Sequence, residues 1–374
     1  MPNLTALCDA VIFTGDAFVE GHALVTGEGK IVDIVSRNRL PGGVKAVSCA
    51  DKILVPGFID AQVNGGGNVM FNNTPTAEAC LAIARAHRRF GTTRLLPTCI
   101  TDHADVTRRA FAAMRDARKK DKGILGIHVE GPHLSEARRG VHLASLIRPM
   151  QEDDIQLYRP EGDETVLVTV APETVPPVQI LRLRGQGAVV ALGHTQAGAA
   201  ETRAALQAGA TGFTHLFNGM GGLSARGEGP ADVALDDRDC WCSIIADGHH
   251  VSAEMIRLAL RAKPGRIFLV SDAMPPSAAD DPQPFDLYGE TIRAENGRCV
   301  NGEGKLAGAV LTMAQAVHNC INKFGIDPRE ALCMATVYPA EFLGLRGMGK
   351  LLPGFAEDVV VMNAKFGVEK VMSG

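Results

Sequence analysis

Apolar runs of strand length alternate with helical segments through most of this chain, and no other feature of the sequence constrains the fold as strongly. Eight such runs lie at residues 53–63, 92–99, 123–131, 165–173, 187–195, 211–218, 240–248 and 266–274. Segments with helical spacing of apolar residues intervene or follow, which is typical of βα units around a parallel sheet. Eight units within roughly 250 to 300 residues predict an α/β fold with a (β/α)8 TIM-like barrel.

Both ends of the chain have a different pattern from its middle. Short β-like pieces separated by glycine turns fill residues 1–53, and similar strands return in residues 346–374. We expect one small β-sandwich domain built from both termini, beside a catalytic barrel of residues 54–345. A hairpin-like segment near 285–303, with Asn296 and Gly297 as its turn, predicts an insertion near the barrel mouth.

Composition and charge exclude several classes of protein. Hydrophobic residues make up 46% and charged residues 21% of the 374 positions, which is the balance of a globular protein. A formal charge of -4 predicts no nucleic-acid partner and no anionic membrane surface as partner. No apolar run approaches the roughly 20 residues that cross a bilayer, and the first residues lack a secretory signal pattern. Nine cysteines without a repeated spacing are typical of free thiols, so we expect a cytoplasmic protein.

The residues that close the predicted strands are unusually polar. Active sites of such barrels lie at the carboxyl ends of the strands, where Glu130, His194, His215, His250 and Asp272 all fall. A single histidine at such a place is more often a hydrogen-bonded core or rim residue. Several ionisable groups at one rim are costly without a compensating charge, and a divalent metal is the natural compensation. One carboxylate with two imidazoles leaves positions open for water, as in a catalytic metal site.

Seven short motifs, in one order across nearly the whole chain, carry a family resemblance: PGFID, HVEGP, GHT, THLFNGM, ADGHHV, VSDAM and KLAGA. Together they resemble the N-acetylglucosamine-6-phosphate deacetylases of the amidohydrolase superfamily. The resemblance implies a metal-bearing barrel that removes the acetyl group from N-acetyl-D-glucosamine 6-phosphate in amino-sugar catabolism and recycling. The implied products are D-glucosamine 6-phosphate and acetate. A homodimer is also implied, in which Arg226 reaches the phosphate in the neighbouring active site.

The resemblance assigns roles to individual residues. The metal ligands of the family fall on Glu130, His194 and His215, and its catalytic acid/base falls on Asp272. Asp272 is expected to take a proton from the attacking water and to hand one to the departing amine. His142 matches the histidine that polarises the acetyl carbonyl and is also a substrate-binding residue. The other substrate-binding positions fall on Val141, Asn218, Gly219, Arg226, Asp247, His250, Leu306, Ala307 and Gly308.

The stretch after the first predicted strand bears on the number of metal ions. Gln62 and Asn64 stand where many amidohydrolases have two histidines that hold a second metal ion. Neutral amides are poor ligands for a transition metal compared with imidazole, so we expect both to hydrogen-bond in the vacated space. The prediction is one divalent ion per subunit, with Zn²⁺ as first choice and Fe²⁺, Mn²⁺ or Co²⁺ as the other candidates.

Two alternatives stay open from the sequence. Deacetylation of N-acetylgalactosamine 6-phosphate differs in the configuration of one hydroxyl group, which the sequence does not decide. A non-catalytic phosphosugar-binding protein is an alternative of another class, although a binder would need neither the metal ligands nor the acid/base. The chain also departs from the family, which commonly has REPG where residues 226–229 read RGEG, and often an aromatic or aliphatic residue in place of His133.

Overall fold

The centre of the molecule is an eight-stranded sheet in which neighbouring strands are all parallel. A computed structural model describes residues 4–40, 42–227, 229–304 and 306–373. The strands of the sheet are β8 (Phe58–Val63), β11 (Thr92–Ile100), β12 (Gly126–Glu130), β13 (Thr165–Val170), β14 (Val189–Leu192), β15 (Gly212–Phe213), β16 (Trp241–Ile244) and β17 (Ile267–Leu269). Their order in space is their order along the chain, as a (β/α)8 barrel requires. The predicted barrel is confirmed.

Backbone contacts just beyond the strand ends bring the first and last strands of the barrel together. Val63 forms a parallel bridge with Ala273. The amide of Asp272 donates to the carbonyl of Gln62 at 3.1 Å, and the amide of Gly65 donates to the carbonyl of Ala273 at 2.9 Å. The strand ends that carry Gln62 and Asp272 are therefore held against each other.

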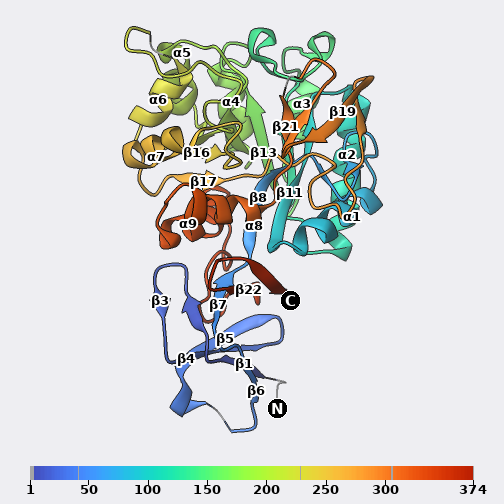
Figure 1. The fold of residues 1–374 in the computed structure, drawn as a ribbon. Coiled ribbons are helices and arrows are strands. Elements are labelled where there is room, and N and C mark those ends of the chain that lie inside the picture. The colour runs from blue at the N-terminus through green and yellow to red at the C-terminus, as the bar shows by residue number, and fades with distance from the viewer. Residues whose placement is uncertain (1–3, 41, 228, 305, 374) are drawn as a thin grey trace.

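Helices cover the outside of the barrel (Figure 1). They are α1 (Ala77–Arg88), α2 (Ala104–Lys120), α3 (Glu152–Leu157), α4 (Pro177–Gly185), α5 (Ala199–Gln207), α6 (Pro230–Asp236), α7 (Ala253–Ala262), α8 (Met313–His318), α9 (Pro328–Ala335) and α10 (Val337–Phe342). Hydroxyl caps begin several of them; Thr76 accepts from the amide of Ala79 at the start of α1. The buried faces of the helices and the barrel strands form one continuous hydrophobic core. The strand ends that carry the predicted site residues are therefore held in place by this continuous core.

Strands from the two ends of the chain form two further sheets, which occupy the lower part of Figure 1 together with both termini. One contains β1 (Thr5–Cys8), β4 (His22–Gly27), β5 (Lys30–Ser36) and β6 (Lys45–Ser48). The other contains β2 (Val11–Phe13), β3 (Phe18–Val19), β7 (Lys52–Pro56), β22 (Val359–Asn363) and β23 (Val368–Met372). Val55 of β7 pairs with Val360 of β22, so the two termini share a sheet.

The two terminal sheets pack against each other. Leu7, Leu24 and Ile31 from the first sheet form one buried cluster with Leu54 and Val359 from the second. The predicted β-sandwich built from both termini is therefore confirmed. The second sheet extends through Pro56 at the end of β7, and the boundary between residues 53 and 54 stays a prediction.

A small antiparallel sheet follows the last barrel strand. It contains β18 (Phe285–Leu287), β19 (Glu290–Glu295), β20 (Arg298–Val300) and β21 (Leu306–Ala309). Asn296 and Gly297 form the turn between β19 and β20 with φ of 50° and 78°, a conformation that these residue types adopt readily. A bridge from Ala309 to Ala273 attaches β21 to the end of the barrel. The insertion therefore lies beside the strand ends on which the site was predicted.

The remaining elements are short. They are β9 (Gly65–Gly66), β10 (Val69–Met70), the 3-10 helices Arg37–Arg39, Glu136–Arg138 and Ala144–Leu146, and one π-helical turn, Asn319–Lys323. All nine cysteines are free thiols. Within the described ranges, no helix combines the length and the apolar character that a membrane span requires.

Candidate metal centre

Four barrel strands bring the predicted metal ligands and the predicted acid/base together. Glu130 is the last residue of β12, whereas His194, His215 and Asp272 lie two or three residues beyond β14, β15 and β17. These three residues have positive φ angles of 47°, 33° and 48°. Such angles are uncommon for residues other than glycine and cluster at functional sites. The backbone at these strand ends is thus held in a conformation that the surrounding structure must stabilise.

The ligand atoms of Glu130, His194 and His215 converge on one point. Oε1 of Glu130 lies 2.8 Å from Nε2 of His215 and 3.4 Å from Nε2 of His194. The two Nε2 atoms are 3.0 Å apart, and the ligand atoms of this set all lie within 4.8 Å of one another. Ligands bound at about 2.0 to 2.2 Å in a tetrahedral zinc site are themselves roughly 3 to 3.5 Å apart. The spacing fits a single ion held by all three.

A hydrogen bond to the backbone fixes the tautomer of one of the two ligand histidines. Nδ1 of His194 lies 2.9 Å from the carbonyl of Arg138, to which it can only donate. The lone pair of the neutral ring is then on Nε2, which faces the cluster, the arrangement usual for a histidine that binds a metal. His215 has no such contact, because its Nδ1 is buried without a partner among the described residues. The donor set therefore suits a divalent cation, with the tautomer of one imidazole already determined.

The charges of the cluster favour a cation. Burial by itself raises the pKa of Glu130, but its contacts with the imidazoles of His194 and His215 outweigh it and hold that pKa well below its usual range. Burial lowers the pKa of His215, yet the hydrogen bond and charge of Glu130 outweigh this and raise it above 6.5. An ionised carboxylate thus holds a proton on its neighbour, and a metal ion would compete with that proton.

The two amides that follow β8 bind the carboxylates of the site. Nδ2 of Asn64 donates to Oδ1 of Asp272 at 2.7 Å, and Nε2 of Gln62 donates to the same oxygen at 3.2 Å. Gln62 also donates to Oε1 of Glu130 at 3.0 Å. Burial, followed by the negative charge of Glu130, raises the pKa of Asp272. These contacts show where the amide side chains lie, and the number of metal ions stays a prediction.

His142 stands beside the ligand set. Its Nε2 lies 3.9 Å from Oε2 of Glu130, and its ring centre is 4.5 Å from that of His194. Burial lowers the pKa of His142 to about 3, so the ring is neutral near pH 7. Its Nδ1 lies 2.8 Å from the hydroxyl of Thr101. A neutral ring whose Nδ1 accepts from that hydroxyl carries its hydrogen on Nε2 and can donate it to a carbonyl.

Most of the residues predicted for the site line one cavity of about 180 Å³. They are Asn64, Glu130, Val141, His142, His194, His215, Asn218, Gly219, His250, Asp272, Leu306 and Gly308. Gly219 has a φ of 59°, and a Cβ there would lie 2.7 Å from Nδ1 of His194, so only glycine fits. The barrel mouth thus combines the ligand set with the loops assigned to the sugar phosphate.

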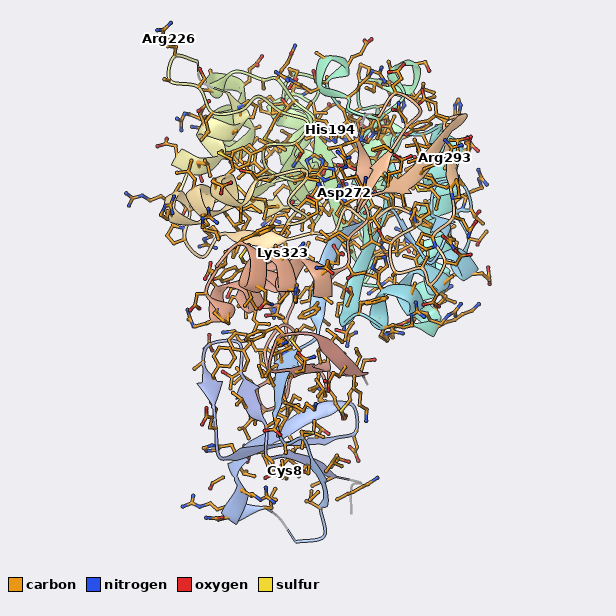
Figure 2. All side chains as sticks on the ribbon, viewed as in Figure 1. Cys8, His194, Arg226, Asp272, Arg293 and Lys323 are labelled. Carbon is orange, nitrogen blue, oxygen red and sulfur yellow. The ribbon has the colours of Figure 1, made fainter. Side chains whose placement is uncertain are left out.

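Three residues predicted to bind substrate lie outside the lining of this cavity. The carboxylate of Asp247 is 2.6 Å from Nδ1 of His250 and orients that ring. Ala307 is fully buried in a hydrophobic cluster with Met274, because alternation along β21 turns it away from the cavity. Arg226 lies at the outer tip of a loop, away from His194 and Asp272 inside the barrel (Figure 2). Glu228, two residues further along the unusual RGEG stretch, lies outside the described residues.

The cavity also contains residues that the sequence analysis missed. Its lining includes Ile100, Gly140 and Met274. The hydroxyl of Thr101 forms a hydrogen bond with Nδ1 of His142. Ile100 closes β11, so the rule that strand ends form the site could have found it and its neighbour Thr101. Gly140 and Met274 carry no charged group, and the VSDAM motif that ends at Met274 drew attention only to Asp272.

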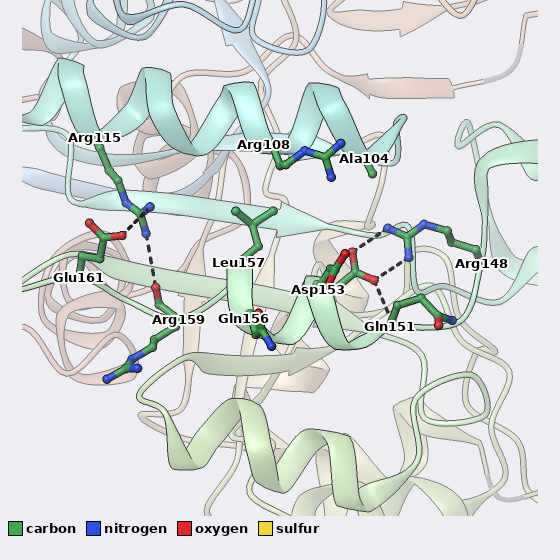
Figure 3. Close-up of a pocket in the computed structure, with 11 residues that line it drawn as sticks. Ala104, Arg108, Arg115, Arg148, Gln151, Asp153, Gln156, Leu157, Arg159 and Glu161 are labelled. Carbon is green, nitrogen blue, oxygen red and sulfur yellow. Dashed lines mark hydrogen bonds and ion pairs between the residues drawn. The ribbon is translucent and has the colours of Figure 1, made fainter.

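A larger cavity of about 660 Å³ lies between α2 and α3, away from the barrel mouth (Figure 3). Four arginines line it: Arg108, Arg115, Arg148 and Arg159. Arg148 binds Asp154 at 2.6 Å, and Arg115 binds Glu161 at 2.8 Å. Next to this cavity, the buried His133 lies 3.1 Å from the hydroxyl of Tyr158. His133, unusual for the family, therefore has a buried polar partner directly after α3.

Comparison with known proteins agrees with this geometry. The family model described as the amidohydrolase family matches residues 53–374, and the model described as the NagA composite domain matches residues 5–54. An N-acetylgalactosamine-6-phosphate deacetylase of Shewanella sp. (strain ANA-3) is 42% identical over 82% of this chain and 78% of its own length. An N-acetylglucosamine-6-phosphate deacetylase of Haemophilus influenzae is 31% identical over 91% of this chain and 90% of its own length.

Solved structures lead to the same group. The crystal structure of N-acetylglucosamine-6-phosphate deacetylase from Pasteurella multocida superposes with a TM-score of 0.95 at 31% identity, covering 99% of this chain and 98% of that one. The superposition includes the terminal sheets as well as the barrel. With a family model that spans the barrel and relatives above 30% identity along most of its length, this chain belongs to the amidohydrolase family.

Proposed function

We propose that this protein is a metal-dependent deacetylase that hydrolyses N-acetyl-D-glucosamine 6-phosphate to D-glucosamine 6-phosphate and acetate. One observation carries the proposal, namely that Glu130, His194 and His215 converge in a buried cavity with Asp272 directly beside them. The printed names of the bacterial relatives support the substrate class. A protein that only binds phosphosugars would need neither the ligand set nor a buried acid/base.

Glu130, His194 and His215 are the proposed ligands of one divalent ion. Such an ion supplies Lewis-acid chemistry, since it polarises the oxygen atoms bound near it. Zn²⁺ is our first choice because one carboxylate and two imidazoles suit it, although Fe²⁺, Mn²⁺ and Co²⁺ accept the same donors. Gln62 and Asn64 take the place of ligands for a second ion, and their hydrogen bonds to Asp272 support this assignment.

Asp272 is the proposed acid/base. As the oxygen of water forms a bond to the acetamide carbonyl carbon, Asp272 accepts the proton that the water loses. It then gives a proton to the nitrogen as the carbon–nitrogen bond breaks, so acetate and the amine leave. Asn64 and Gln62 both donate to Oδ1, which leaves Oδ2 for the proton. His142 donates to the carbonyl oxygen as negative charge develops there, a contact worth roughly 3 to 4 kcal/mol in such sites.

The sugar phosphate is proposed to bind through the loops that surround the cavity. Asn218 and Gly219 would hold the phosphate with backbone and amide donors, aided by His250, which Asp247 orients. Leu306 and Gly308 of the segment that includes Ala307 would cover the sugar. Arg226, at its loop tip, is proposed to reach the active site of the partner subunit in a homodimer.

We also propose that the chain divides into a small β domain of residues 1–53 with 346–374 and a catalytic barrel of residues 54–345. A cytoplasmic location is proposed as well, and the free cysteines support it.

The test is acetate release from the metal-loaded protein. We expect turnover of N-acetyl-D-glucosamine 6-phosphate, and much weaker turnover of N-acetyl-D-glucosamine, which lacks the phosphate. Metal analysis should find about one ion per chain. Stoichiometric metal without acetate release from any N-acetylated sugar phosphate would sink the proposal.

The relative at 42% identity favours one second candidate, the deacetylation of N-acetylgalactosamine 6-phosphate. The two substrates differ only in the configuration of one hydroxyl group, and both would place the acetamide at the same ligand set. Values of kcat/KM on the two epimers, measured side by side, decide between them.

A further inference from the structure

The cavity at the metal centre adjoins a second, larger one. The smaller cavity has a volume of about 180 Å³ and the larger about 410 Å³. Gly140, Val141 and Leu306 line both, so the two spaces meet at these residues. The larger volume falls in the range of roughly 300 to 1,000 Å³ that holds small-molecule ligands. None of the residues to which we assign the chemistry or the phosphate lines the larger cavity.

One apolar wall runs through both cavities. Ile100 and Met274 line the smaller cavity, and Leu287 and Ile292 line the larger one. All four belong to a single buried cluster, and Val141, at the junction, packs against it. This cluster joins the barrel to the inserted strands β18 and β19. A chain of apolar atoms could therefore pass from the metal centre into the larger cavity without losing contact with the wall.

The position of the junction shows which end of the substrate adjoins the larger cavity. Asn218, Gly219 and His250, the proposed phosphate contacts, line only the smaller cavity. Val141 is the neighbour of His142, which we assign to the acyl carbonyl, and it lines both cavities. With these proposed roles, the acyl group is the end of the substrate that lies nearest the junction, and the phosphate lies away from it.

The rim of the larger cavity is polar and partly acidic. Glu290 and Glu303 line it, and Glu290 accepts a hydrogen bond from Asn301 at 3.1 Å. Arg139, the basic residue among the described residues of the rim, donates to the carbonyl of His142 at 2.8 Å and is held by that contact. An acyl chain that ends in a carboxylate would place that charge against the apolar wall and beside Glu290. A neutral apolar chain would meet the wall of the cluster.

We propose that the larger cavity is a subsite for neutral N-acyl chains longer than acetyl, so the substrate class is N-acyl hexosamine 6-phosphates. The inference rests on the proposed deacetylase function and extends it. The chemistry is unchanged: water adds to the acyl carbon, the carbon–nitrogen bond breaks, and a longer carboxylate leaves in place of acetate. Burial of each added methylene group would favour binding by at most about fourfold.

The test compares chain lengths on the metal-loaded protein. We expect kcat/KM for N-propanoyl and N-butanoyl glucosamine 6-phosphate to equal or exceed that for the N-acetyl compound, by up to about fourfold per methylene. An N-succinyl substrate, which has a terminal carboxylate, should fall at least tenfold below N-butanoyl. A steady fall of a hundredfold or more from acetyl to butanoyl would overturn the proposal.

Leu143 gives a variant that tests the cavity itself. It lines only the larger cavity and is 38% exposed, so a larger side chain there has room to fold. Leu143→Trp should lower kcat/KM for the N-butanoyl substrate at least tenfold and leave the N-acetyl value within about twofold. Leu181→Trp, at a 60% exposed leucine of α4, is the matched control and should change neither. Equal losses on both substrates in Leu143→Trp would contradict a separate acyl subsite.

One more substrate tests whether the larger cavity binds the acyl chain or a substituent at the anomeric carbon of the sugar. A butyl glycoside of N-acetylglucosamine 6-phosphate carries the same apolar group at the anomeric carbon. If Leu143→Trp affected only this compound, the cavity would belong to the anomeric substituent and the acyl assignment would be wrong. Metal-loaded protein that hydrolysed no chain length at all would instead contradict the deacetylase function on which the inference rests.

Discussion

The metal centre and the arginine-lined cavity between α2 and α3 both gather charged groups in a hollow, but they balance charge in different ways. At the arginine-lined cavity each buried carboxylate has a guanidinium partner: Asp154 binds Arg148 at 2.6 Å and Glu164 binds Arg115 at 2.8 Å. At the metal centre no arginine or lysine of the described chain pairs with Glu130 or Asp272. The buried carboxylates beside the first cavity are paired with permanent cations, whereas at the metal centre the described residues offer Glu130 only a proton held on His215. A cluster that lacks its counter-charge indicates a ligand, and a large charged cavity by itself does not.

The largest expected effect is a loss of activity that follows a substitution at the metal centre and not one at the arginine-lined cavity. Asp272→Asn keeps the shape of the side chain but removes the acid/base, so kcat should fall by about 10² to 10⁴-fold while the metal content is unchanged. Asp153→Asn, at an exposed aspartate of the arginine-lined cavity, is the control and should leave kcat within twofold. Acetate release and metal analysis on both variants give the answer. A loss below tenfold in Asp272→Asn would mean that another group moves the proton.

Metal removal should affect the stability of only one region. An ion present at a hundred times its Kd stabilises the folded state by about 2.7 kcal/mol. Chelation should therefore abolish activity and lower Tm, and added Zn²⁺ should restore both. In Glu130→Gln the Tm should no longer respond to metal, whereas in Arg108→Ala the response should match the unaltered protein. A Tm of Glu130→Gln that still rises with metal would place the ion elsewhere.

A buried histidine near each of the two cavities should lower the stability of the fold as the pH falls. Burial lowers the pKa of His87, behind the metal centre, and of His133, behind the arginine-lined cavity, to about 4. Since the unfolded chain binds these protons near pH 6.5, each histidine lowers stability as pH falls from 6.5 towards 4. The loss is roughly 2 kcal/mol per histidine between pH 6.5 and pH 5.

His87→Gln tests this pH dependence. Glutamine can still donate to the carbonyl of Gly65, which His87 meets at 2.9 Å, but it does not titrate. Urea unfolding at pH 6.5 and pH 5 should show a smaller loss of stability in this variant than in the unaltered protein. His22→Gln, at a partly exposed histidine at the start of β4, is the control. An unchanged difference between the two pH values would mean that His87 is not the titrating group.

The smallest effect concerns the ion pair beside the arginine-lined cavity. Arg148→Met leaves the buried Asp154 without its guanidinium, and because Arg148 is itself partly exposed the loss should be about 1 to 2 kcal/mol. Arg108→Ala removes an exposed arginine and should change stability by less than about 0.5 kcal/mol. Activity should be unaffected in both. A large loss of kcat in Arg148→Met would connect the two regions through His133, which lies 3.8 Å from Asp154.

Much of the architecture could be predicted because its signals are local. Apolar runs of strand length that alternate with helical segments predicted the eight barrel strands, and the strand-end rule predicted Glu130, His194, His215 and Asp272 at the barrel mouth. Ala307 shows the limit of such reasoning. It falls within a motif assigned to the substrate, yet alternation along β21 places it in the hydrophobic cluster while Leu306 and Gly308 line the cavity. Membership of a motif does not say which way a side chain points.

The sequence by itself determined the fold class, the order of the strands and the chemical types at the barrel mouth, because these follow from residue spacing and connection length. Tertiary structure alone decided which atoms meet. The carbonyl of Arg138 selects the tautomer of His194, 56 residues away. Asn64 reaches Asp272 across 208 residues where the first and last strands come together. The junction between the two cavities likewise needs the insertion packed on the barrel. Such contacts depend on how distant segments pack, which no local pattern in the sequence encodes.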